Sequence, residues 1–125
     1  MIAIDSSSLI AYLSGASGAD VSAVESALEG KHACLPPVVL TELLSDPELP
    51  GPVDALLREL PSLNLSEGYW ERAGKLRARA VAAHRKAPLA DTLIAQSCLD
   101  HDVPLITRDR DFHSFERFSR LKLLP

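Results

Sequence analysis

Short apolar runs alternate with helical patterns along this chain, and no tight hairpin joins one run to the next. The runs lie at residues 1–4, 32–35, 63–65, 104–107 and 121–124. The segments between them carry apolar residues at helical spacing. Strands that alternate with helices pair in parallel, because each helix carries the chain back across the sheet. The pattern therefore predicts an α/β domain with a mainly parallel central sheet of 4–5 short strands.

Three of the expected helices begin at prolines or at a capping serine. Pro36-Pro37 and Pro88 suit the first turn of a helix, where a missing N–H costs nothing. Ser66 is expected to cap a long helix that reaches Ala83. We expect Trp70 on that helix, together with Phe112 and Phe115, to lie in the core. The helices are expected over residues 6–13, 20–28, 38–44, 53–60, 66–83 and 88–99.

Length and composition favour one domain that spans residues 1–125. With 46% hydrophobic residues, a chain of this length buries a core without a disulfide or zinc ion. Cys34 and Cys98 lie far apart and form no C-x-x-C pair, which fits a reducing compartment. There is no basic leader segment and no apolar run of about 18 residues. We therefore expect a cytoplasmic protein without a membrane segment.

Charge is distributed unevenly along the chain, whose formal net charge is −4. Residues 1–70 hold 2 basic and 10 acidic residues, and residues 71–125 hold 11 basic and 7 acidic residues. This asymmetry suits two partners of opposite charge, and it equally suits two solvated faces of a soluble protein. Both interpretations stay open on charge alone.

Four acidic residues have mostly apolar neighbours: Asp5, Glu42, Asp91 and Asp109. A carboxylate beside the core must be paired with a base, hydrogen-bonded or bound to a metal. If the four converge, each pair about 4 Å apart repels by about 4 kcal/mol at an effective dielectric of 20. A hard cation such as Mg²⁺ or Mn²⁺ offsets this repulsion and prefers oxygen ligands. Salt bridges remain the alternative for any single member of the set.

The order of these acids resembles a PIN domain. Residues 4–10 (Ile-Asp-Ser-Ser-Ser-Leu-Ile) are similar to its opening, and residues 41–44, 89–95 and 105–112 follow in the same order. Together with the compact length, the set resembles the VapC-type toxins of bacterial toxin–antitoxin pairs. The resemblance covers nearly the whole chain and implies a PIN-like three-layer domain, with helices flanking the central sheet.

The resemblance implies a metal-dependent endoribonuclease. Asp5, Glu42, Asp91 and Asp109 would then be catalytic and would bind one or two Mg²⁺ or Mn²⁺ ions. Asp111 matches a further acid found in some members. The hydroxyls of Ser7 and Thr107 match positions that support the site through hydrogen bonds. One departure is residues 85–88 (Arg-Lys-Ala-Pro), which replace a Gly-rich turn.

Basic residues of the second half are candidates for contact with RNA phosphates. Three of them share one stripe of the long helix, and the others lie beside it in sequence or flank the last acids; an ordinary solvated helix face is the alternative. The candidate set is Arg72, Lys75, Arg79, Arg85, Lys86, Arg108 and Arg110. Transfer RNA, ribosomal RNA and messenger RNA are all compatible substrates.

The resemblance also implies a cognate antitoxin and a homodimer. We expect a basic antitoxin segment to occupy a groove along residues 37–60, beside Glu48, Asp54 and Glu59. A catalytically inactive PIN-like module that binds RNA or a partner is the main alternative function. A phospho-accepting receiver domain is disfavoured, because serines follow Asp5 and no lysine follows Pro104 until Lys122. Nucleotide kinases and GTPases are excluded by the lack of a Gly-rich phosphate loop.

Overall fold

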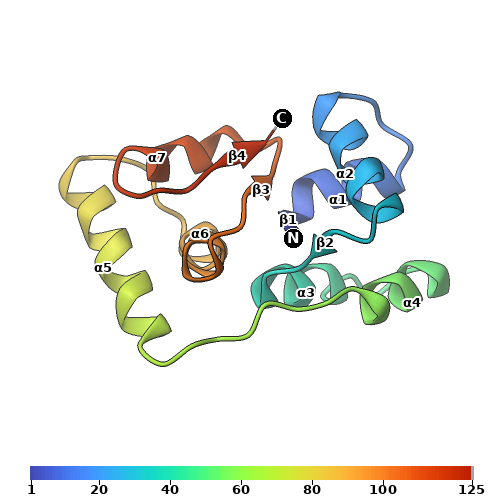
Figure 1. Cartoon of the computed structure of the whole chain (residues 1–125), viewed down its shortest axis with the longest axis horizontal. Coiled ribbons are helices and arrows are strands. Elements are labelled where there is room, and N and C mark those ends of the chain that lie inside the picture. The colour runs from blue at the N-terminus through green and yellow to red at the C-terminus, as the bar shows by residue number, and fades with distance from the viewer. Residues whose placement is uncertain (125) are drawn as a thin grey trace.

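The sheet at the centre of the molecule has four parallel strands (Figure 1). A computed structural model describes residues 1–124; Pro125, included in the expected domain, lies outside the described residues. The strand order is β2 (Ala33–Cys34), β1 (Ile2–Ile4), β3 (Leu105–Ile106) and β4 (Leu123–Leu124). The predicted parallel α/β architecture is confirmed, with strands shorter than the apolar runs suggested.

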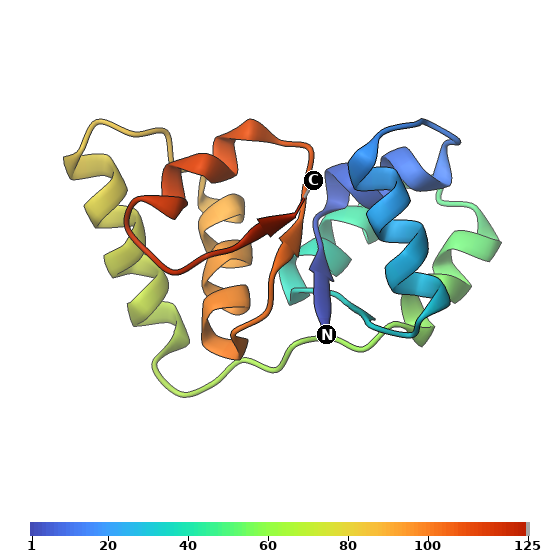
Figure 2. The same ribbon diagram turned by 45° about the horizontal axis from the view of Figure 1, so that its top comes forward.

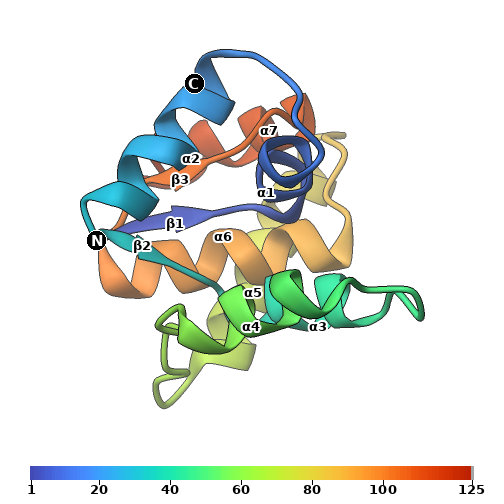
Figure 3. The ribbon, with the colours of Figure 1, turned by 90° about the vertical axis from the view of Figure 1, so that its right-hand side faces the viewer.

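Helices cover both faces of this sheet. Figure 3 shows α2 and α7 on one side of β1 and α3, α4, α5 and α6 on the other. The neighbouring α5 and α6 pack side by side (Figure 2). The helices are α1 (Ser6–Leu13), α2 (Ala19–Glu29), α3 (Pro37–Leu44), α4 (Gly51–Glu59), α5 (Tyr69–Ala82), α6 (Leu89–His101), the 3-10 turn η1 (Arg110–Phe112) and α7 (His113–Glu116). None of those described within residues 1–124 is long and apolar enough to cross a membrane.

The two central strands are buried on both faces. Ala3, Ile4, Leu105 and Ile106 have no exposed surface. A strand covered on both sides reads as a continuous apolar run, without the alternation of a half-exposed strand. Burial of both faces therefore explains why β1 and β3 were predictable from so few residues.

Residues 63–65 do not form the predicted strand. Only Ser62 makes a parallel bridge, to Leu35, supported by hydrogen bonds from Leu35 N to the Pro61 carbonyl and from Leu63 N to the Leu35 carbonyl. Pro61 has no N–H to extend the ladder, and Leu65 is 44% exposed. The segment therefore crosses the edge of the sheet without joining it for more than one residue.

The long helix α5 begins later than predicted and buries a different aromatic residue. Gly68, with a φ of 81°, precedes the helix, whereas the Ser66 hydroxyl bonds to the Asp100 carboxylate at 3.3 Å. Trp70 is 61% exposed, so its predicted place in the core is wrong. Tyr69 is buried instead, and its hydroxyl donates to the Leu93 carbonyl at 2.7 Å. Phe112 and Phe115, on η1 and α7, are buried as predicted.

Candidate metal centre

Acidic side chains gather at the carboxyl ends of the two central strands. Asp5 follows β1 directly, and Asp109 lies three residues beyond the end of β3. Because these parallel strands are neighbours, their ends lie at the same edge of the sheet. Asp91 joins them from the first turn of α6, and Glu42 is carried by α3.

Asp5 is held by two hydroxyl groups that were predicted to support the site. The Ser7 Oγ donates to Asp5 Oδ2 at 2.7 Å, and the Thr107 Oγ1 donates to the same oxygen at 2.8 Å. Within the described part of the chain, its other oxygen, Oδ1, has only a 3.5 Å contact with the Ser6 hydroxyl. Asp5 is 4% exposed and forms no ion pair among the described residues. These contacts fix the carboxylate while leaving Oδ1 weakly engaged.

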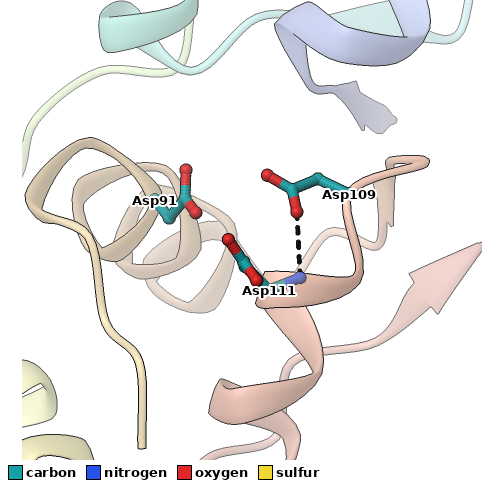
Figure 4. A group of neighbouring side chains, drawn as sticks. All are labelled: Asp91, Asp109 and Asp111. Atoms are coloured by element: carbon teal, nitrogen blue, oxygen red, sulfur yellow. Dashed lines mark hydrogen bonds between the residues drawn. The ribbon is translucent and has the colours of Figure 1, made fainter.

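The loop after β3 arranges the last two acids. The backbone N–H of Asp109 donates to Thr107 Oγ1 at 3.0 Å, and the backbone N–H of Asp111 donates to Asp109 Oδ1 at 2.9 Å (Figure 4). The Asp109 side chain thus caps η1, and this hydrogen bond fixes the position of Asp111 within the 3-10 turn. Two acids separated by one residue therefore present their carboxylates to the same space.

Asp91, Asp109 and Asp111 form a compact cluster of carboxylates. One oxygen from each lies within 4.8 Å of the others, and Figure 4 shows the three groups turned toward one another. Burial, together with the charges of Asp109, Asp5, Asp111 and Glu42, raises the pKa of Asp91 to about 7. Three carboxylates at this separation favour either a bound proton or a cation. The all-oxygen donor set suits Mg²⁺ or Mn²⁺, and it lacks the His or Cys ligands that are typical of zinc sites.

Glu42 lies at the margin of this centre. Its carboxylate accepts a hydrogen bond from Ser6 Oγ at 3.2 Å, and the same hydroxyl faces Asp5. Partial burial raises the pKa of Glu42, and the charge of Asp5 adds to that shift. The side chain lies on the exposed face of α3, although its sequence neighbours are apolar. The predicted acids therefore converge as a cluster of three, with Asp5 and Glu42 beside it.

A lysine also reaches the cluster. Lys86 Nζ lies 2.9 Å from Asp111 Oδ2. The hydrogen bond to Asp111 raises the pKa of the Lys86 ammonium, and the charges of Asp109 and Asp91 act in the same direction. Lys86 belongs to the loop that departs from the Gly-rich turn of the family. The sequence did not predict this contact, because it marks Lys86 only as one of several candidates for contact with RNA phosphates.

Arg108 points away from the acid cluster, toward α2. Its Nε lies 2.8 Å from Asp20 Oδ2 and its Nη2 lies 3.0 Å from Asp20 Oδ1. The Ser8 hydroxyl donates to Asp20 Oδ2 at 2.8 Å. The Arg108 hydrogen bond lowers the pKa of Asp20 to about 2. Nothing in the local sequence distinguished Asp20 from a solvated acid at the start of a helix.

Arg72 is likewise paired within the fold. Its guanidinium makes two contacts with Asp100 on α6, from Nε at 3.0 Å and from Nη2 at 2.7 Å. Lys75 and Arg79 remain exposed on the same helix. The predicted stripe of three bases therefore contains one residue that ties α5 to α6 and two that face solvent.

Comparisons with known proteins agree with this architecture. The sequence matches the model of one protein family, described as the PIN domain, over residues 2–118. The chain belongs to the PIN domain family, as its resemblance implied. A comparison with curated protein sequences finds no significant match.

Several solved structures contain chains of the same fold. VapBC2 from Rickettsia felis, bound to a DNA fragment from its promoter, gives a TM-score of 0.75 at 20% identity, covering 98% of this chain and 97% of the other. VapBC-1 from nontypeable Haemophilus influenzae gives 0.74 at 18% identity, covering 98% and 96%. FitAcB from Neisseria gonorrhoeae gives 0.72 at 18% identity, covering 100% and 97%. At the level of the fold, the resemblance to VapC-type proteins is confirmed.

Proposed function

We propose that this chain is an endoribonuclease dependent on Mg²⁺ or Mn²⁺ and the toxin of a toxin–antitoxin pair. The observation that carries the proposal is the cluster of Asp91, Asp109 and Asp111, whose carboxylate oxygens lie within 4.8 Å of one another. Asp5 and Glu42 stand beside it at the carboxyl ends of the strands, where ligands bind in open α/β sheets. Asp91 carries a strongly raised pKa, which is typical of functional sites.

The acids would hold the cation and the hydroxyls would hold the acids. Asp91, Asp109, Asp5 and Glu42 supply the oxygen ligands, with Asp111 as a fifth. Ser7 and Thr107 fix the orientation of Asp5 through its Oδ2. A divalent cation bound there supplies a water of lowered pKa and stabilises charge on the departing oxygen. Hydrolysis would break the bond from phosphorus to the 3′ oxygen, leaving a 5′-phosphate and a 3′-hydroxyl.

Exposed bases of the second half of the chain would hold the RNA backbone. Lys75 and Arg79 on α5, Arg85 and Lys86 in the following loop and Arg110 on η1 are exposed in the described structure. Phosphate contacts of this kind give affinity without sequence selectivity, and they weaken as salt rises. A PIN-like module that binds RNA without cutting it uses the same bases, so cleavage itself must be measured.

The antitoxin would occupy the hollow beside α1, α3 and α4. A pocket of about 330 Å³ is lined by apolar residues and reaches Glu42. Its apolar lining is Ile10, Leu13, Leu43, Leu49, Pro50 and Val53. An amphipathic segment with basic residues would match this surface. VapBC-5 from Mycobacterium tuberculosis, a member of the VapBC family of toxin–antitoxin systems, contains a chain with the fold of this one. Charge reversal at Asp46, which lines this pocket, combined with reversal at Glu48, Asp54 and Glu59, should weaken complex formation, and unchanged binding would contradict the placement.

The test of the enzyme is cleavage of total bacterial RNA by the purified protein. We expect discrete fragments with Mg²⁺ or Mn²⁺, and none with EDTA or with Asp5→Asn. Glu25→Gln, which removes one charge from an exposed position on α2, is the matched control and should cleave normally. If wild type and Asp5→Asn leave the RNA pool equally intact in both metals, the proposal is contradicted. Light scattering of the same samples tests the proposed homodimer.

A further inference from the structure

We propose that Lys86 is the resident counter-cation of the acid cluster, displaced by the divalent cation and then available to a phosphate of the RNA. The inference rests on the proposed function, because it assigns a role within the same site. Its starting point is the 2.9 Å contact between Lys86 Nζ and Asp111 Oδ2. Within the part of the chain that the structure describes, no other base forms an ion pair with Asp91, Asp109 or Asp111.

The loop that carries Lys86 is fixed on both sides of it. The Arg85 N–H donates to the Ala80 carbonyl at 2.9 Å, at the end of α5. Arg77 Nε donates to the Ala87 carbonyl at 2.9 Å, and Ala87 is buried against the core. The backbone of Lys86 is therefore positioned by the fold, whereas its side chain is 70% exposed. An anchored backbone with a free side chain allows the ammonium to change partners without rearranging the loop.

A divalent cation in the cluster and the ammonium compete for the Asp111 carboxylate. Repulsion between the two cations at contact distance weakens the hold of the ammonium on Asp111 Oδ2. Metal binding therefore releases Nζ, which stays within a side chain's length of the cluster. A phosphate bound to the metal would meet this ammonium with up to three hydrogen-bond donors. Lys86 would then lower metal affinity in the free protein and raise affinity for RNA in the loaded protein.

The first measurement is a titration of the metal-free protein with Mn²⁺ at 150 mM KCl. The electron paramagnetic resonance signal of the free ion reports how much Mn²⁺ remains unbound. We expect Lys86→Gln to bind Mn²⁺ about threefold more tightly than wild type, the scale set by an exposed ion pair. Lys86→Arg keeps the charge and should bind as wild type does. Arg117→Gln removes the same charge from an exposed residue that forms no ion pair in the described structure, and it should leave Mn²⁺ affinity unchanged.

The second measurement is the rate of RNA cleavage at saturating Mn²⁺. We expect Lys86→Gln to cleave about tenfold more slowly despite its tighter metal binding, with Lys86→Arg restoring most of the rate. Unchanged or weaker Mn²⁺ binding in Lys86→Gln would overturn the inference, as would an unchanged rate at saturation. Wild-type protein that neither binds Mn²⁺ nor cleaves RNA would instead overturn the proposed function, so the two failures are distinguishable.

Discussion

The Thr107 hydroxyl donates to Asp5 Oδ2 at 2.8 Å, although the two residues lie 102 positions apart in the chain. The same oxygen of Thr107 accepts the backbone N–H of Asp109 at 3.0 Å. One side chain thus connects the first and the last of the predicted acids. The pairing of β1 with β3 brings them together, and the hydrogen bond from Asp5 N to the Ile106 carbonyl extends that pairing by one residue.

Removing this hydroxyl should weaken the site more than the fold. In Thr107→Val, Asp5 loses one donor and the Asp109 N–H loses its acceptor, so we expect about 1–2 kcal/mol less stability in urea unfolding. RNA cleavage should fall at least tenfold, since both acids lose their orientation. Thr107→Ser retains the oxygen and is the matched control. Wild-type cleavage by Thr107→Val would show that the hydroxyl does not position the acids.

The ion pair between Arg108 and Asp20 should contribute measurably to stability. Asp20 is 7% exposed and accepts from both Arg108 and Ser8, so Asp20→Asn leaves these donors poorly matched. We expect a loss of about 1–3 kcal/mol, below the cost of breaking a fully buried pair because the Arg108 side chain is 39% exposed. Asp54→Asn breaks the exposed pair with Arg58 and should cost less than about 0.5 kcal/mol.

The pH dependence of this pair has a definite sign. The pKa of Asp20 is lowered to about 2 in the folded protein, from an ordinary value of 3.8. Its stabilising contribution is therefore complete above the unfolded pKa and is lost as the pH falls through that of the folded state. Urea unfolding of wild type and Asp20→Asn between pH 2 and pH 6 measures the difference. A gap between the two proteins that widens toward low pH would contradict the assignment.

In the metal-free protein, the contribution of Asp91 to stability should change with pH in the opposite direction. Its pKa is raised from 3.8 to about 7 by burial and then by the neighbouring carboxylates. The folded state therefore binds more protons than the unfolded state between these values, and stability from this group falls as the pH rises through about 7. In EDTA, Asp91→Asn should be more stable than wild type at pH 8, with a smaller difference at pH 5.

A divalent cation should remove the loss of stability that ionisation of Asp91 causes at pH 8, because it binds the ionised carboxylates. We expect Mg²⁺ to raise the melting temperature of wild type at pH 8 and to leave Asp91→Asn nearly unchanged. Thermal unfolding in EDTA and in Mg²⁺ measures both effects, with Glu25→Gln as the matched charge control. Equal stabilisation of wild type and Asp91→Asn by Mg²⁺ would show that Asp91 does not contribute to the cation site.

The sequence allowed prediction of those parts of the site that depend on strand ends and on local apolar context. Asp5 and Asp109 follow buried strands, and parallel pairing places such residues at one edge. Asp91 was identifiable because its flanks are apolar and offer no basic residue within about one helical turn. The family resemblance supplied the order of the set and the hydroxyl of Thr107, which no local pattern marks.

Contacts between side chains of distant segments could not be predicted in the same way. The pairing of Arg108 with Asp20 spans 88 positions and depends on how α2 packs beside the sheet. The contact of Lys86 with Asp111 depends on the path of a loop. The error at Tyr69 and Trp70 arose because adjacent aromatic residues both fit a helical stripe, and only packing decides which one is buried. The Tyr69 hydroxyl has a carbonyl acceptor inside the fold, which makes its burial favourable.

The bases of α5 should separate into one structural residue and two that contact RNA. Arg72 binds Asp100 through two nitrogens, so Arg72→Gln should lower the midpoint of urea unfolding. Lys75 and Arg79 are exposed, so the double variant Lys75→Gln/Arg79→Gln should unfold within about 0.5 kcal/mol of wild type.

The same double variant should lose affinity for RNA, because two phosphate contacts disappear. Anisotropy of fluorescently labelled bulk tRNA with metal-free protein, at 50 and 200 mM KCl, should show weaker binding and a salt slope reduced by about 1 per lost contact. Weaker binding with an unchanged slope would mean that these residues do not meet phosphates. An Arg72→Gln variant that keeps its stability but loses tRNA affinity would return Arg72 to the RNA-contacting set, since its pairing with Asp100 would then be dispensable to the fold.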